Sequence, residues 1–141
     1  MRSLSLVLAP AVALGAALAS AQEKPTYDVS AAHMGAETYR VYCASCHGKD
    51  AKGTGPLADS LRIRPPDLTL LAHRNDGKYP KERVHKIIDG RESVKGHGGS
   101  DMPVWCDTFK NAREGYDDAK VKERIDELVD YIHSIQESPS K

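Results

Sequence analysis

Cys43-Ala44-Ser45-Cys46-His47 is the most informative stretch of this 141-residue chain. It places two thiols three positions apart and an imidazole directly after the second thiol. Residues three apart on a helical turn lie on the same face, so the Cys43 and Cys46 side chains should point the same way. The stretch therefore predicts one site to which two sulfur atoms and one ring nitrogen contribute.

Covalent haem attachment is the chemistry that fits this spacing best. Both thiols can add to the two vinyl groups along one haem edge, and His47 then lies beneath the ring as a ligand to the iron. A thioredoxin-like redox pair has the same Cys spacing but requires a βαβ context that the sequence does not indicate. A zinc site requires four ligands, and no second Cys-x-x-Cys pair is present. A structural disulfide between Cys43 and Cys46 is the remaining alternative.

The opposite side of such an iron needs a second ligand, and methionine is the candidate. Apart from the first residue, the chain has two methionines, Met34 and Met102. Met34 belongs to the helix expected before the motif, whereas Met102 lies in a Gly-rich loop that can fold back across the ring. We therefore predict His47 and Met102 as the two iron ligands, with a partly buried core Met102 as the alternative. A soft thioether favours Fe(II) and raises the reduction potential.

The first 21 residues form a segment of their own. Arg2 is followed by an apolar run from Leu4 to Leu18 and by the small residues Ala19-Ser20-Ala21. This pattern is typical of a secretory signal peptide, and the run is shorter than the ~20 residues of a membrane-spanning helix. We therefore expect export to the periplasm, with membrane attachment only if the segment stays uncleaved.

The rest of the chain is expected to form one domain. We place a flexible lead-in over residues 22–30, the folded domain over residues 31–136 and a polar tail over residues 137–141. Twenty basic residues balance 20 acidic ones, without a basic stripe, so we expect no nucleic-acid binding. The three cysteines, an odd number in an exported protein, cannot all pair within the chain.

Periodicity predicts helices and no convincing strand. Ser30 is a candidate N-cap for a helix that runs toward Cys43, and a short turn is expected between Leu57 and Leu61. Pro80 fits the first position of a helix that ends at Gly90. The clearest stripe repeats at steps of four and three, as in one helix face; its members are Val121, Ile125, Leu128, Ile132 and Ile135.

Several spaced elements agree with one known family. They are Gly35-x-x-x-Tyr39-x-x-x-Cys43, Gly53-x-Gly55-Pro56-Leu57, Pro65-Pro66-Asp67-Leu68, Ile87-Ile88-x-Gly90 followed by Met102-Pro103-x-Trp105, and Leu128-x-x-Tyr131-Ile132. Together with the Cys-x-x-Cys-His motif, they resemble the class I monohaem cytochromes c of bacteria from about Gly35 to Ile132. The resemblance implies an all-α cytochrome c fold in which the N- and C-terminal helices cross around one covalently attached haem c.

The resemblance also implies roles for individual residues. Pro56 would accept a hydrogen bond from His47 through its carbonyl, with Pro66 as a rival for that role. Leu68 would lie against the ring, and Trp105 would donate its indole N–H to a haem propionate.

Other positions stay open. Arg62, Arg64 and Arg74 are candidates to neutralise the propionates. Cys106 occupies a place where the family usually has a small residue such as Gly; we expect an inert thiol there, with an intermolecular disulfide as the alternative.

The expected function is that of an exported electron carrier, not an enzyme. It would cycle Fe(II) and Fe(III) between transient redox partners, a donor dehydrogenase or reductase and an acceptor oxidase. Partners would dock at the haem edge, where Lys49 and Lys52 could steer an acidic surface. A haem sensor or peroxidase-like enzyme with an opening sixth position is one alternative, and a subunit of a larger complex is another.

Overall fold

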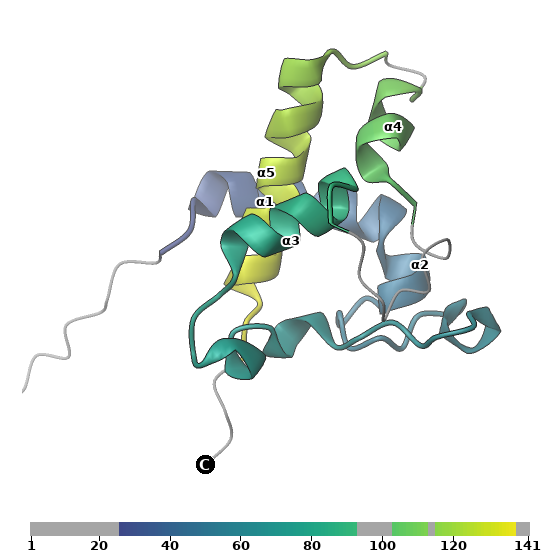
Figure 1. Ribbon diagram of the computed structural model, residues 1–141, viewed down its shortest axis with the longest axis vertical. Coiled ribbons are helices and arrows are strands. Elements are labelled where there is room, and N and C mark those ends of the chain that lie inside the picture. Colours follow the sequence, from purple (N-terminus) through teal and green to yellow (C-terminus); the bar gives the residue numbers. More distant parts are fainter. Residues whose placement is uncertain (1–25, 93–102, 113–114, 138–141) are drawn as a thin grey trace, which may run out of the picture.

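The computed structural model of this chain describes residues 26–92, 103–112 and 115–137. The regular structure in these ranges is entirely helical, which confirms the all-α prediction (Figure 1). The α-helices are α1 (Val29–Tyr42), α2 (Ala44–His47), α3 (Lys81–Asp89), α4 (Trp105–Lys110) and α5 (Asp118–Ser134), and the 3-10 turns are η1 (Ala58–Ser60), η2 (Leu68–Leu70) and η3 (His73–Asn75).

Helices α1 and α5 are the two longest of these, and they cross (Figure 1). Gly35 lies at the crossing, because a Cβ atom there would come within 2.0 Å of the Glu127 carbonyl oxygen. Only glycine allows the two backbones to approach this closely. One turn later, Tyr39 is 2% exposed and its ring centroid lies 5.1 Å from that of Tyr131. The predicted close crossing of the first and last helices is therefore confirmed.

The apolar stripe of α5 forms the centre of the core. Four of its five predicted members lie within the helix and are at most 5% exposed: Val121, Ile125, Leu128 and Ile132. Ile135 is the residue after the helix and packs against the core while partly buried. The period of the sequence pattern thus predicted both the helix and its buried face.

Two helix starts differ slightly from the sequence-based expectation. Helix α1 begins at Val29, and the Asp28 carboxylate caps it by accepting a hydrogen bond from the Ala31 backbone N–H at 2.9 Å. The expectation that Ser30 is the N-cap was wrong, since Asp28 satisfies the free N–H group first. Helix α3 begins one residue after Pro80 and ends as predicted at Gly90, whose φ of 89° is left-handed.

Helix α4 was not expected from the sequence. It buries Trp105 and Phe109, which are 9% and 0% exposed, one turn apart on the same face. Its start is set against the end of α3, where a Cβ on Gly90 would lie 2.4 Å from a Val104 methyl group. A six-residue helix with two apolar anchors carries too little periodicity to be recognised in the sequence.

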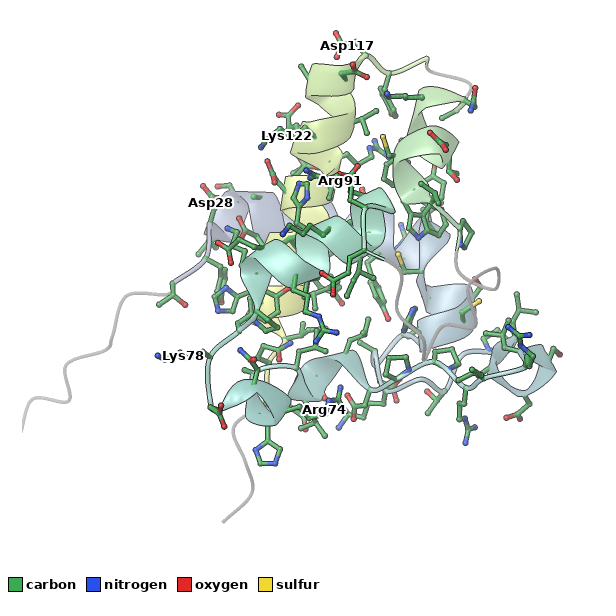
Figure 2. All side chains as sticks on the ribbon, in the orientation of Figure 1. Asp28, Arg74, Lys78, Arg91, Asp117 and Lys122 are labelled. Atoms are coloured by element: carbon green, nitrogen blue, oxygen red, sulfur yellow. The ribbon has the colours of Figure 1, made fainter. Side chains whose placement is uncertain are left out.

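Most charged side chains lie on the surface, whereas Asp130 is buried. The six that Figure 2 labels are all exposed: Asp28, Arg74, Lys78, Arg91, Asp117 and Lys122. Within the part of the chain that the structure describes, no helix is both long and apolar enough to cross a lipid bilayer.

Candidate functional site

The Cys-x-x-Cys-His motif forms the single turn of α2, directly after α1. The backbone N–H groups of Cys46 and His47 both donate to the Cys43 carbonyl, at 3.2 and 2.9 Å. Gly48 then ends the turn with a φ of 82°, a conformation that side chains rarely adopt. The turn therefore has the helical geometry that the spacing of the two thiols predicted.

A cavity opens beside this turn, and Cys43, Cys46 and His47 all line it. The rest of its wall is almost entirely apolar, with contributions from every α-helix: Tyr39, Tyr42, Leu61, Ile63, Pro65, Pro66, Leu68, Leu71, Arg83, Val84, Ile87, Ile88, Pro103, Trp105, Leu128 and Ile132. A large apolar cavity with a few converging polar groups is the usual form of a cofactor site.

The three motif side chains are suited to hold a flat, apolar, metal-containing group. Both Cys43 and Cys46 are free thiols and are not joined to one another. Burial raises the pKa of the Cys43 thiol to about 12, with a smaller contribution from the neighbouring Cys46. The His47 imidazole is 6% exposed at the cavity wall. This donor set fits a haem bound through two thioethers and one imidazole.

A metal ion bound directly by His, Cys, Asp and Glu side chains would be a different kind of site. Within residues 26–92, 103–112 and 115–137, no group of three or more His, Cys, Asp and Glu side chains is placed to hold a metal ion.

The predicted residues outside the motif are placed unequally. Leu68 and Trp105, each 9% exposed, both line the cavity. Met102 lies outside the described residues, while Pro103, the next residue, lines the cavity. The roles predicted for these side chains toward a ring remain predictions.

Pro56 and its rival Pro66 lie in different surroundings. Pro66 lines the cavity, whereas Pro56 is exposed and is not part of the cavity wall. The loop that carries Pro56 is nevertheless tied to the motif, since Leu57 N–H donates to the Ser45 carbonyl at 2.9 Å. Gly55 packs so closely there that a Cβ would come within 2.6 Å of the Cys46 carbonyl oxygen.

Two of the three arginines named as candidates to neutralise haem propionates make contacts with other groups of the chain in this structure. Arg64 pairs with Asp59 at 3.1 Å, and Arg74 donates to the Asp67 carbonyl. Arg83, which the sequence analysis did not single out, does line the cavity and pairs with Glu92 at 2.8 Å.

The position of Arg83 could have been recognised from the sequence. It precedes Ile87 by four residues on α3, and residues four apart share a helix face. Ile87 also lines the cavity.

Cys106 lies on α4 and not at the cavity. It is partly buried and free, and desolvation raises the pKa of its thiol while Lys110 opposes the shift. A raised pKa reduces the thiolate fraction and with it the reactivity of the thiol. The expectation of an inert thiol at this position remains a prediction.

Comparisons with known proteins agree with this site. Residues 30–132 match the family model described as cytochrome c oxidase, cbb3-type, subunit III. The chain is also 30% identical over 112 residues to the cbb3-type cytochrome c oxidase subunit CcoP of Azospirillum brasilense. That match covers 79% of this chain but only 31% of the relative. A comparison with solved structures found no match.

These findings confirm the cytochrome c resemblance, the covalently bound haem c and the role of a haem electron carrier. The matched region spans α1 to α5 and contains every residue described above as lining the cavity. The chain therefore belongs to the family of c-type cytochrome domains described as cytochrome c oxidase, cbb3-type, subunit III.

Proposed function

We propose that this protein is an exported one-electron carrier with a single haem c held by Cys43, Cys46, His47 and Met102. The observation that carries the proposal is the convergence of both motif thiols and the following imidazole on one apolar cavity. A haem bound there supplies an iron that cycles between Fe(II) and Fe(III).

Each motif side chain has a separate task in this proposal. Cys43 and Cys46 form thioether bonds and prevent the loss of the group from a small domain. His47 supplies the ring nitrogen on one side of the iron. Met102 would supply a thioether as a second ligand to the iron, which would leave no position open for a substrate. On this basis the protein is not an enzyme.

The apolar wall excludes water from the iron and favours its less charged reduced form. Leu68, at the start of η2, and Trp105, at the start of α4, both contribute to that wall. A dry surrounding and a thioether ligand both raise the reduction potential.

Redox partners are proposed to dock at the open side of the cavity. Ile63 lines the cavity and is also 40% exposed, so one side chain joins the interior to the surface. A small apolar patch suits the brief contacts of an electron carrier.

The name of the relative supports a proposal about the partner class, and the pattern of the first 21 residues supports one about the location. The Azospirillum brasilense protein is named as a subunit of a cbb3-type oxidase, which suggests an oxidase as acceptor and a dehydrogenase or reductase as donor. We propose the periplasm as the location and exclude nucleic acid and, after signal cleavage, the membrane as partners.

Covalent attachment is tested by expressing the full chain in a host that matures c-type cytochromes. The wild type should carry one haem by intact mass and by haem stain on a denaturing gel, and the reduced protein should show a c-type absorption spectrum. The double variant Cys43→Ala/Cys46→Ala should lose the covalent haem, since no thioether bond can form.

The matched control is Cys106→Ala, because Cys106 is a free cysteine of the same chain that lies away from the cavity. It should keep the full haem content. Wild-type protein without added mass from such a host would refute the proposal.

A further inference from the structure

Gln136 joins the end of α5 to the segment that carries Leu68. It lies two residues beyond the helix and makes three partly buried side-chain hydrogen bonds. Its Nε2 donates to the Leu68 carbonyl at 2.8 Å and to the Ile132 carbonyl at 2.7 Å. Its Oε1 accepts from the Ala72 N–H at 2.8 Å. Both ends of the amide are therefore used, across 64 and 68 positions of sequence.

The segment that Gln136 holds forms part of the cavity wall. Leu68 and Leu71 both line the cavity, and the Gln136 amide bonds lie at Leu68 and Ala72, on either side of this turn. Ile132, the third partner, lines the same cavity from α5. One side chain thus connects two parts of the wall that the chain does not connect locally.

Leu68 is also held from its other side by the loop that follows the motif. Its N–H donates to the Ala51 carbonyl at 2.8 Å, and Ala51 is fully buried. The same loop returns to the motif through Gly53 N–H, which donates to the His47 carbonyl at 2.8 Å. The Leu68 backbone therefore lies between the motif loop and Gln136, and removal of either bond would leave it held on one side only.

We propose that Gln136 is a positioning residue that keeps Leu68 and Leu71 packed against the haem and thereby raises the reduction potential. The inference rests on the proposed haem site and adds a residue that acts through others, since Gln136 is not part of the cavity wall. Its effect follows from solvent access: a looser wall admits water, which stabilises the more charged oxidised iron and lowers the potential.

Neighbouring contacts at this helix end do not replace the amide. Glu137 N–H donates to the Thr69 carbonyl at 2.8 Å, and the Glu137 carboxylate pairs with Lys52 at 2.7 Å. The Lys52 and Glu137 side chains are 43% and 49% exposed, and exposed ion pairs of this kind contribute little. The Gln136 amide donates to the Leu68 carbonyl and accepts from the Ala72 N–H at the same time, which the exposed ion pair does not do.

The test compares Gln136→Met with the wild type, both as full chains with covalent haem. Methionine keeps the length of the side chain, adds no charge and removes all three hydrogen bonds. The Ala72 amide should exchange with solvent at least tenfold faster by NMR. The equilibrium constant for reduction should fall about threefold, which is about 30 mV at 59 mV per tenfold for one electron.

Ser134→Ala is the matched control. Ser134 ends α5 two residues earlier, is partly buried and donates to the Tyr131 carbonyl at 2.7 Å within its own helix. Its removal should leave the exchange of Ala72 and the potential unchanged. Gln136→Glu is a second variant, for which only amide exchange is measured, because its added charge would itself change the potential. The carboxylate can still accept from the Ala72 N–H, but it cannot donate to the Leu68 carbonyl, and the two oxygens repel. The Leu68 amide should therefore exchange faster than in the wild type.

Two results would overturn the role of Gln136. The first is that the Ala72 amide of Gln136→Met exchanges as slowly as in the wild type. The second is that it exchanges faster while the reduction potential does not change, because Gln136 would then have only a structural role. Both are measured on protein that carries haem, so they are distinct from failure of the proposed function, in which the wild type would carry no haem at all.

Discussion

Met102 and Met34 test the iron ligand at the scale of single residues. In Met102→Ala the predicted thioether is absent, so the potential should fall by on the order of 100 mV, within the ~0.8 V that axial ligands span. The reduced protein should also gain carbon monoxide binding at the position that opens. Redox titration and visible spectroscopy measure both changes.

Met34→Ala is the control for this experiment. Met34 is 55% exposed on α1, and its removal should change neither the potential nor carbon monoxide binding. An unchanged spectrum and potential in Met102→Ala would remove Met102 as a ligand and favour a different sixth group.

The crossing of α1 and α5 can be tested at the scale of elements through Gly35. Helix propensity alone predicts that Gly35→Ala stabilises α1 by about 1 kcal/mol. The close approach predicts the opposite, because the new Cβ would meet the Glu127 carbonyl oxygen at 2.0 Å and both helices would have to separate. Overpacking of this kind costs about 1–3 kcal/mol, so we expect net destabilisation.

Denaturant unfolding of the haem-loaded protein measures this change. Gly77→Ala is the comparison, since a Cβ there meets nothing within 4 Å and only the φ of 78° opposes it. A Gly35→Ala variant that is as stable as the wild type or more so would show that the helices do not cross as closely as described.

The C-terminal end of α5 should make stability depend on pH. His133 stacks on Tyr79 with ring centroids 4.2 Å apart, and burial lowers the pKa of the imidazole while Asp130 opposes the shift and Lys81 adds to it. Thr26 and Tyr27 contact the same ring from the N-terminal side. The folded protein therefore binds the His133 proton less readily than the unfolded chain does.

The free energy of unfolding should consequently fall as the pH decreases below about 6.5, the ordinary pKa of histidine in the unfolded chain. Above that pH, His133 should cause no further change. In His133→Phe this part of the dependence should disappear, with the stacking on Tyr79 kept. Unfolding midpoints at pH 5.5 and 7.5 measure the slope, and His73→Gln, at an exposed position of η3, is the matched control. Equal slopes in wild type and His133→Phe would contradict the prediction.

At the scale of the whole molecule, every α-helix of the described residues lines the cavity. Without an occupant, the side chains on the cavity wall lose their apolar partner on that side, and the remaining core is the cluster packed around α5. We therefore expect Cys43→Ala/Cys46→Ala protein free of haem to lose its cooperative thermal transition and to bind a hydrophobic dye. Far-ultraviolet circular dichroism and dye fluorescence measure this; a sharp transition near the wild-type temperature would contradict it.

The sequence by itself determined the parts of this protein that depend on local spacing. Two thiols three apart with a following imidazole predicted the proposed haem site, and the steps of four and three in α5 predicted the buried face of that helix. The family resemblance implied that the N- and C-terminal helices cross, and the structure places Gly35 at that crossing. The thiol spacing and the apolar stripe could be predicted because each depends on the spacing of residues within one stretch of the chain.

Tertiary structure alone decided the rest. Helix α4 forms because Trp105 and Phe109 find a core to pack on. In the sequence Gln136 is an ordinary polar residue at the end of the expected domain, and only the fold brings it to Leu68, 68 positions away. A contact between two residues so far apart in the chain leaves no periodic pattern in the sequence. The identity of one residue does not restrict the residues that surround the other.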